Sequence, residues 1–108
     1  MKNKIYSYNS LKADLKNINS EIFSIGKTHL GREIYCIKQG TGTKEILYAG
    51  AFHGMEWLTS AMLMKFIKNI EKSYVLPEEV TLFTIPMVNP DGVEISKFRE
   101  GWQANARG

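Results

Sequence analysis

Two apolar segments separated by a helix-like stretch constrain the fold of this 108-residue chain most strongly. Residues 45–52 and 80–88 are apolar with hardly any alternation, which is typical of strands that are buried on both faces of a sheet. Between them, residues 56–72 place apolar side chains at helical spacing, with Leu58, Met62 and other residues on one expected apolar face. A strand, a helix and a strand in this order form a βαβ unit. We therefore predict an α/β fold.

Shorter elements are expected in the first half of the chain. Apolar residues at i, i+4 and i+7 predict an amphipathic helix over residues 10–19, with Ser10 as its N-cap. Two stretches rich in β-forming residues, 21–25 and 33–38, predict strands on either side of a turn. Near the other end, Asn-Pro-Asp-Gly at residues 89–92 is a strong turn signal and follows the second buried segment.

Composition and charge exclude several classes of protein. The apolar share of 44% and the charged share of 23% are ordinary for a globular domain, which argues against disorder. The net charge of +3 is scattered along the chain, so no nucleic-acid partner is expected. The longest apolar run, residues 46–52, is far below the roughly 18 residues of a membrane-spanning helix. The basic amino terminus leads into no apolar signal segment, and Cys36, read as a small buried hydrophobic residue, has no intrachain disulfide partner. We expect a cytoplasmic protein with no membrane partner.

The sharpest chemical feature is the pair His53 and Glu56, which follows the first apolar segment and begins the predicted helix. Ligands of α/β proteins bind at the carboxyl ends of the strands. An imidazole and a carboxylate three residues apart can converge there, both are zinc ligands, and Gly54 permits a sharp turn between them. Two other interpretations stay open at this point: Glu56 as a first-turn acid that complements the helix dipole, and His53 as a core histidine bonded to a carbonyl.

Other candidates are weaker. Residues 89–92 belong to the same edge of the sheet as His53, but a turn explains them sufficiently. His29 has no visible partner and would join a metal site only by approaching His53. Ser60 lacks the Gly-x-Ser-x-Gly context of a serine hydrolase. Residues 102–108 bring an indole, an amide and a guanidinium close together in sequence, which is a weak signal by itself.

Four stretches, taken in order, resemble the zinc carboxypeptidase family of the carboxypeptidase A-like type. They look closest to its bacterial branch of gamma-D-glutamyl-diamino acid endopeptidases, which cut cell-wall peptides. The stretches are residues 25–34 (IGKTHLGREI), 49–60 (AGAFHGMEWLTS), 84–92 (TIPMVNPDG) and 102–108 (WQANARG). The resemblance implies a mixed, largely parallel sheet flanked by helices. Residues 1–108 are then expected to be the amino-terminal portion of a single catalytic domain that is incomplete at its carboxyl end.

The resemblance also assigns roles to residues. It implies that His53 and Glu56 are two of three protein ligands of one catalytic Zn²⁺, with a water in the open position. A separate glutamate acts as general base in the family, so Glu56 is not expected to do so. That glutamate and the third ligand, a histidine, lie downstream in the family, and the chain alone is expected to be inactive and to bind zinc weakly. Gln103 stands where the family has an oxyanion-stabilising arginine. Arg107 is the nearest candidate for an oxyanion or substrate contact.

The expected function is therefore that of a fragment of a zinc metallopeptidase, with cell-wall-derived gamma-D-glutamyl peptides as candidate substrates. Two alternatives stay open. One is a zinc acyl-amino-acid deacylase of the aspartoacylase type, which also uses His-x-x-Glu, and the other is a metal-free binding or assembly module. The stretches around residues 89–92 and 102–108 favour the peptidase. Because flanking strands would be missing, the sheet should also have an unpaired apolar edge that favours self-association.

Overall fold

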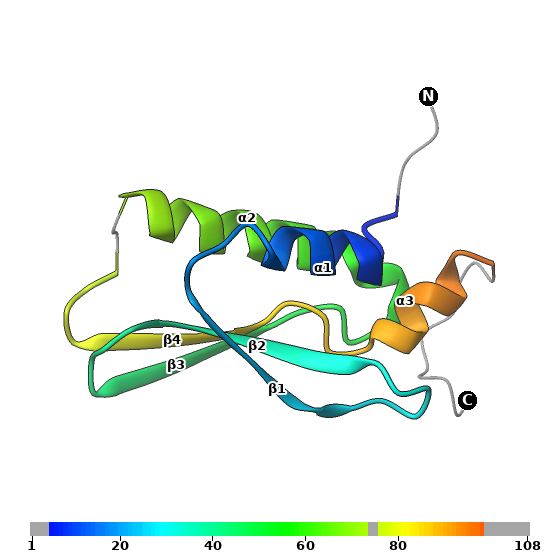
Figure 1. Ribbon diagram of the computed structural model, residues 1–108, viewed down its shortest axis with the longest axis horizontal. Coiled ribbons are helices and arrows are strands. Elements are labelled where there is room, and N and C mark those ends of the chain that lie inside the picture. The colour runs from blue at the N-terminus through cyan, green and yellow to red at the C-terminus, as the bar shows by residue number, and fades with distance from the viewer. Residues whose placement is uncertain (1–4, 74–75, 99–108) are drawn as a thin grey trace.

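The computed structural model describes residues 5–73 and 76–98, and it has the predicted α/β architecture, with helices packed on a four-stranded mixed sheet (Figure 1). The elements follow in the order α1 (Tyr8–Leu15), β1 (Glu21–Lys27), β2 (Glu33–Gly40), β3 (Lys44–Ala49), η1 (Gly54–Glu56), α2 (Trp57–Ser73), β4 (Val80–Ile85) and α3 (Pro90–Ser96). The element η1 is a single turn of 3₁₀ helix.

The strands lie in the order β1-β2-β4-β3. The pairs β1–β2 and β2–β4 are antiparallel, whereas β3 and β4 are parallel and are connected through α2. This arrangement confirms the predicted βαβ unit. It also places the end of β3 next to the end of β4, where Ala49 pairs with Ile85.

The core lies between one face of the sheet and the helices α1 and α2, which lie side by side over it in Figure 1. Its buried members are Tyr8, Leu11, Leu15, Ile18, Ile37, Ala51, Met64, Ile67, Met87 and Val93. The apolar positions predicted for the first helix are therefore buried. Cys36 is buried as well, as expected, and this burial raises the pKa of its thiol above the ordinary value.

The first helix starts earlier than the sequence suggested. Its N-cap is Ser7 and not Ser10, because the two serines form a reciprocal capping box. The backbone N–H of Ser10 donates to Ser7 Oγ at 3.0 Å, and the backbone N–H of Ser7 donates to Ser10 Oγ at 3.2 Å. Two donors that a helix leaves unsatisfied at its start are thereby satisfied, which fixes the boundary.

The prediction that β3 is buried on both faces is wrong. Its side chains face solvent, with Ile46, Leu47 and Tyr48 exposed by 41%, 61% and 44%. The reason is that β4 is its one pairing partner within the described residues, so β3 forms an edge of the sheet. β4 lies between two strands and is buried as predicted, but it ends at Ile85 because Pro86 has no N–H to donate to a ladder.

The predicted apolar face of α2 is only partly correct. The helix buries a stripe formed by Ser60, Met64, Ile67 and Ile70. Leu58, Met62 and Phe66 lie on a second stripe that is exposed in the described part of the molecule. The ring of Phe66 packs 5.9 Å from that of Tyr48 on β3, so this stripe continues the exposed apolar edge of the sheet.

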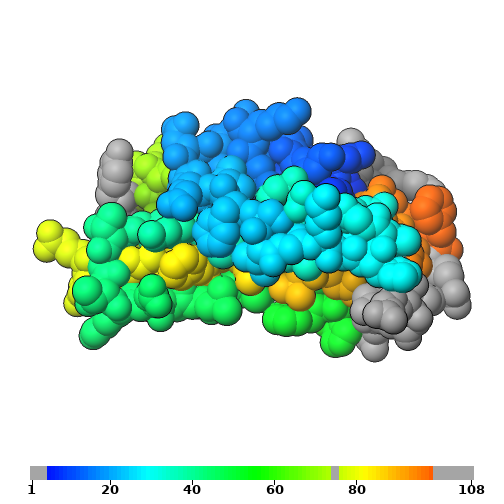
Figure 2. Space-filling model, turned by 60° about the horizontal axis from the view of Figure 1, so that its bottom comes forward, coloured from blue at the N-terminus to red at the C-terminus, as the bar shows by residue number. Residues whose placement is uncertain are grey.

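The face of the sheet opposite the helices is turned toward the viewer in Figure 2, where yellow atoms of β4 reach the surface between its neighbouring strands.

Within residues 5–73 and 76–98, no helix is both long and apolar enough to cross a membrane.

Candidate metal site

The structure brings His53 and Glu56 together at the carboxyl end of β3. The strand ends at Ala49, a short loop follows, and η1 then leads into α2. His53 Nδ1 lies 2.9 Å from Glu56 Oε2, and the two side chains are 49% and 47% exposed. The backbone N–H of Glu56 donates to the carbonyl of His53 at 3.0 Å, which closes the turn between them. His53 is therefore not a core histidine, and both side chains are accessible from solvent.

The electrostatics of the pair favour an ionised carboxylate. The hydrogen bond with the His53 side chain lowers the pKa of Glu56, desolvation opposes this effect, and a hydrogen bond from the His53 backbone adds to it. That backbone N–H donates to Glu56 Oε1 at 3.4 Å. Glu56 thus offers carboxylate oxygens next to an imidazole nitrogen at neutral pH.

These donors fit two positions around a zinc ion. Zinc bonds to imidazole nitrogen and carboxylate oxygen are about 2.0–2.2 Å long, which brings two donors on one ion to on the order of 3 Å from each other. The separation of 2.9 Å between His53 Nδ1 and Glu56 Oε2 is of that size. Within the described residues, however, no group of three or more His, Cys, Asp or Glu side chains is arranged to hold a metal ion.

The loop before His53 is attached to α2 through Thr59. The backbone N–H of Ala51 donates to Thr59 Oγ1 at 2.8 Å, and the Thr59 hydroxyl donates to the carbonyl of Glu56 at 2.7 Å. Ala51 is buried and adopts a left-handed φ of 55°. A non-glycine residue in that region carries strain of about 1–3 kcal/mol, so packing and hydrogen bonds must hold the loop in this conformation. No pattern in the sequence marks Thr59 for this role.

The same loop is attached on its other side to α3, through Asn89. The prediction of a turn at residues 89–92 is wrong: Asn89 is the N-cap of α3, with Pro90 in the first turn. Asn89 Oδ1 accepts the backbone N–H of Gly92 at 2.9 Å. The side-chain amide of Asn89 donates to the carbonyl of Phe52 at 3.2 Å, and its backbone N–H donates to the carbonyl of Ala51 at 3.0 Å.

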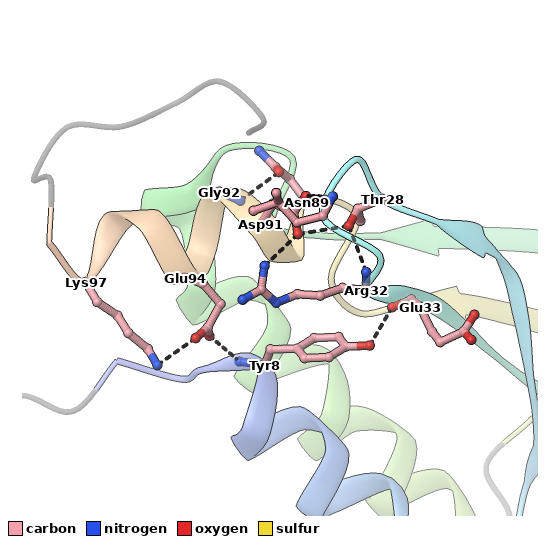
Figure 3. Close-up of polar contacts among 10 residues, drawn as sticks. Tyr8, Thr28, Arg32, Glu33, Asn89, Asp91, Gly92, Glu94 and Lys97 are labelled. Carbon is pink, nitrogen blue, oxygen red and sulfur yellow. Dashed lines mark hydrogen bonds and ion pairs between the residues drawn. The ribbon is translucent and has the colours of Figure 1, made fainter. Parts of the chain in front are cut away.

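Asp91, in the first turn of α3, is the most deeply buried carboxylate near the site, with 1% of its side chain exposed. Figure 3 shows the guanidinium of Arg32 pointing at it, and the distance from Arg32 Nη1 to Asp91 Oδ1 is 2.8 Å. The hydroxyl of Thr28 donates to the same oxygen at 2.9 Å, and the backbone N–H of Leu30 donates to Oδ2 at 3.1 Å. Burial raises the pKa of Asp91, but the hydrogen bonds from Arg32, Thr28 and Leu30 outweigh it, so the pKa lies below its ordinary value.

The hollows in the surface differ in their distance from His53. One of about 310 Å³ lies beside the loop and is lined by His29, Phe52 and Asn89. His29 therefore lines a neighbouring hollow and forms no three-residue metal group with the pair within the described residues. Another hollow, of about 490 Å³, is lined by residues such as Gly40 and lies at the opposite end of the sheet, away from His53 and Glu56.

Ser60 is buried and donates its hydroxyl to the carbonyl of Pro86 at 2.5 Å, which is a structural role. Trp102, Gln103 and Arg107 lie outside the described residues.

Comparison with known proteins identifies the family to which this chain belongs. The family model for zinc carboxypeptidases matches residues 5–108. The chain therefore belongs to the zinc carboxypeptidase family, and the resemblance seen in the sequence is confirmed.

Individual proteins agree with this assignment. The chain is 30% identical over 107 residues to the gamma-D-glutamyl-L-diamino acid endopeptidase 1 of Lysinibacillus sphaericus, a match that covers 83% of this chain and 27% of that protein. It is 32% identical over 84 residues to a zinc carboxypeptidase of Saccharothrix mutabilis subsp. capreolus, covering 66% of this chain and 19% of the relative. The crystal structure of a metallo-carboxypeptidase from Burkholderia cenocepacia has the same fold, with a TM-score of 0.80 at 21% identity over 95% of this chain and 30% of that one. The chain thus spans less than a third of the length of these proteins.

Proposed function

We propose that this chain is part of a zinc metallopeptidase in which His53 and Glu56 supply two of the protein ligands of one Zn²⁺. The observation that carries the proposal is the separation of 2.9 Å between His53 Nδ1 and Glu56 Oε2 at the carboxyl end of β3, in a chain of the zinc carboxypeptidase family. Open α/β sheets bind ligands at this edge. Both side chains face solvent, so an ion and a substrate have access to them.

The ion and the residues that hold it are proposed to have different chemical roles. When bound, zinc supplies Lewis acidity, which activates water and polarises a carbonyl group. Glu56 is proposed to hold the ion, because its Oε2 lies 2.9 Å from His53 Nδ1, and the role of general base is proposed to belong to another residue. The third ligand and the general base are proposed to lie outside the described residues. Arg107 stays a proposed oxyanion or substrate contact.

Peptides that contain a gamma-D-glutamyl linkage, as in cell-wall material, are the proposed substrate class. The support is the likeness to the Lysinibacillus sphaericus protein, whose name states that linkage. The same likeness favours a peptidase over an acyl-amino-acid deacylase and over a metal-free module. We further propose that residues 1–108 form the amino-terminal portion of one catalytic domain. The match to 27% of that relative supports a part of a domain.

The test compares hydrolysis of a gamma-D-glutamyl peptide by residues 1–108 and by a longer product of the same reading frame. We expect turnover by the longer product, its loss with a zinc chelator, and its return with added Zn²⁺. Glu56→Gln should lower turnover by about 100-fold or more, because loss of a ligand should cost at least as much as loss of a residue that orients one, which is about 10–100-fold. Glu78→Gln, an exposed carboxylate at the other end of the sheet, is the matched control. Turnover that Glu56→Gln leaves unchanged would contradict the proposal.

A further inference from the structure

The backbone on both sides of His53 contacts the start of α3. Phe52, which precedes His53, accepts the side-chain amide of Asn89 through its carbonyl. Gly54, which follows His53, faces Gly92 so closely that a Cβ on Gly54 would lie 2.2 Å from the Gly92 carbonyl oxygen. The position of His53 is therefore set by the position of the first turn of α3.

The first turn of α3 is in turn fixed by Asp91 to the turn between β1 and β2. Three donors from this turn reach the carboxylate: the guanidinium of Arg32, the hydroxyl of Thr28 and the backbone N–H of Leu30. Thr28 Oγ1 also accepts the backbone N–H of Arg32 at 3.0 Å, so this bond fixes Thr28 and Arg32 relative to each other. The Asp91 carboxylate can occupy few other positions, because moving away from these donors would leave a buried negative charge without its hydrogen-bond partners.

We propose that Asp91 is a positioning residue for the metal site, acting through the first turn of α3 on the loop that carries His53. The inference rests on the proposed function, since it assigns Asp91 a role in holding a ligand residue. The chain of contacts runs from the turn at Thr28–Arg32, through Asp91 and its neighbours Asn89 and Gly92, to the backbone beside His53. Among the described residues, Asp91 itself forms no hydrogen bond with His53 or Glu56.

Glu94, on the same helix, is the matched control. Its Oε2 accepts the backbone N–H of Tyr8 at 2.9 Å, and its Oε1 lies 2.8 Å from Lys97 Nζ, as the lower part of Figure 3 shows. The bond from Tyr8 joins α3 to the start of α1, and toward the turn between β1 and β2 Glu94 has a charge interaction with Arg32 but no hydrogen bond among the described residues. Glu94→Gln therefore removes one negative charge and weakens one anchor of α3, as Asp91→Asn does, but it leaves the anchor beside His53 in place.

The first measurement is the dissociation constant of Zn²⁺, obtained by competition with a chromophoric chelator. Asp91→Asn is expected to raise it about tenfold, the lower end of the range for residues that orient metal ligands, whereas Glu94→Gln should change it less than about twofold. Equal weakening in both variants, at equal loss of stability against urea, would overturn the proposal, because a merely structural role predicts that result. No change in Asp91→Asn would overturn it as well.

The second measurement needs no metal and separates this inference from the proposed function. The backbone N–H groups of Val88 and Asn89 donate to the carbonyls of Gly50 and Ala51 in the loop. In Asp91→Asn these two amides should exchange with solvent at least about tenfold faster relative to amides of the β2–β4 ladder, and in Glu94→Gln they should not. If the native chain binds no zinc, the proposed metal site fails, and the exchange rates still decide whether Asp91 holds the loop.

Should Asp91→Asn not fold, Thr28→Val removes one donor while keeping the shape of the side chain. Unchanged exchange in the folded variant would overturn the positioning role.

Discussion

Gly54 and Gly92 lie in backbone contact, although one precedes α2 and the other belongs to α3. A Cβ built on Gly54 would lie 2.2 Å from the carbonyl oxygen of Gly92 and 2.5 Å from its carbonyl carbon. No side chain fits between them, so the glycine at position 54 permits the loop of His53 to rest directly on the start of α3. This close approach joins the proposed metal ligands to a helix about forty residues further along the chain.

Gly54→Ala should therefore destabilise the fold. The added methyl group meets backbone atoms that cannot rotate away, and overpacking of this kind costs about 1–3 kcal/mol. Urea denaturation monitored by tryptophan fluorescence or circular dichroism measures the loss. A variant as stable as the native chain would show that the loop and α3 are not in contact as described.

Asn89→Ala should lower the free energy of unfolding by about 1–2 kcal/mol, because it removes the N-cap of α3 and the contact with the Phe52 carbonyl. Asn17→Ala is the matched control, since its exposed amide donates only a long bond of 3.3 Å to the Ala13 carbonyl among its recorded contacts. We expect the control to change stability by less than about 0.5 kcal/mol, as most surface substitutions do. Equal losses in the two variants would argue against a capping role for Asn89.

Stability should fall on acidification. The pKa of Asp91 is lower in the folded chain than its ordinary value of 3.8, so the unfolded chain binds the proton first as the pH falls. The contribution of the carboxylate is complete above the unfolded pKa and disappears as the pH drops through the folded pKa. Urea midpoints measured between pH 6 and pH 2 should decline more steeply for the native chain than for Asp91→Asn. Parallel curves would contradict the assignment of a low pKa to Asp91.

The exposed edge of β3 should make the chain self-associate, which stays a prediction. Leu47→Lys places a charge on this edge, where the native side chain is 61% exposed, and should shift sedimentation toward the monomer. Leu30→Lys is the control, because Leu30 is 57% exposed but lies in the turn between β1 and β2. If both substitutions act equally, or if neither acts, association does not run through β3.

Local periodicity was sufficient to predict the α/β class and the βαβ unit, because strands and helices bury side chains at different spacings. It was insufficient for β3, since the burial of an edge depends on what covers it and not on its own sequence. Asn-Pro-Asp-Gly fits a turn and also fits the start of a helix, because proline is favoured in the first helical turn as it is in turns. Local residue types did not decide between the two at residues 89–92.

The candidate site, too, was predictable from the sequence only in part. His53 and Glu56 were recognisable because they are close in sequence and follow a strand. The ion pair of Arg32 and Asp91 joins residues 59 positions apart, and no local pattern marks it. The hydroxyl of Thr59 bonds to the backbone of Ala51 and of Glu56, but threonine is common in helices, so its residue type alone does not predict this role.

A Zn²⁺ titration of the purified chain, comparing His53→Ala with His29→Ala, tests the proposed metal ligands most directly. Both variants lose one exposed imidazole, but only His53 lies against Glu56. We predict that the native chain and His29→Ala bind Zn²⁺ weakly and with the same dissociation constant, since only two ligands are proposed among the described residues, and that His53→Ala loses this binding. Undiminished zinc binding by His53→Ala, or equal losses in both variants, would contradict the assignment of His53 and Glu56 as metal ligands.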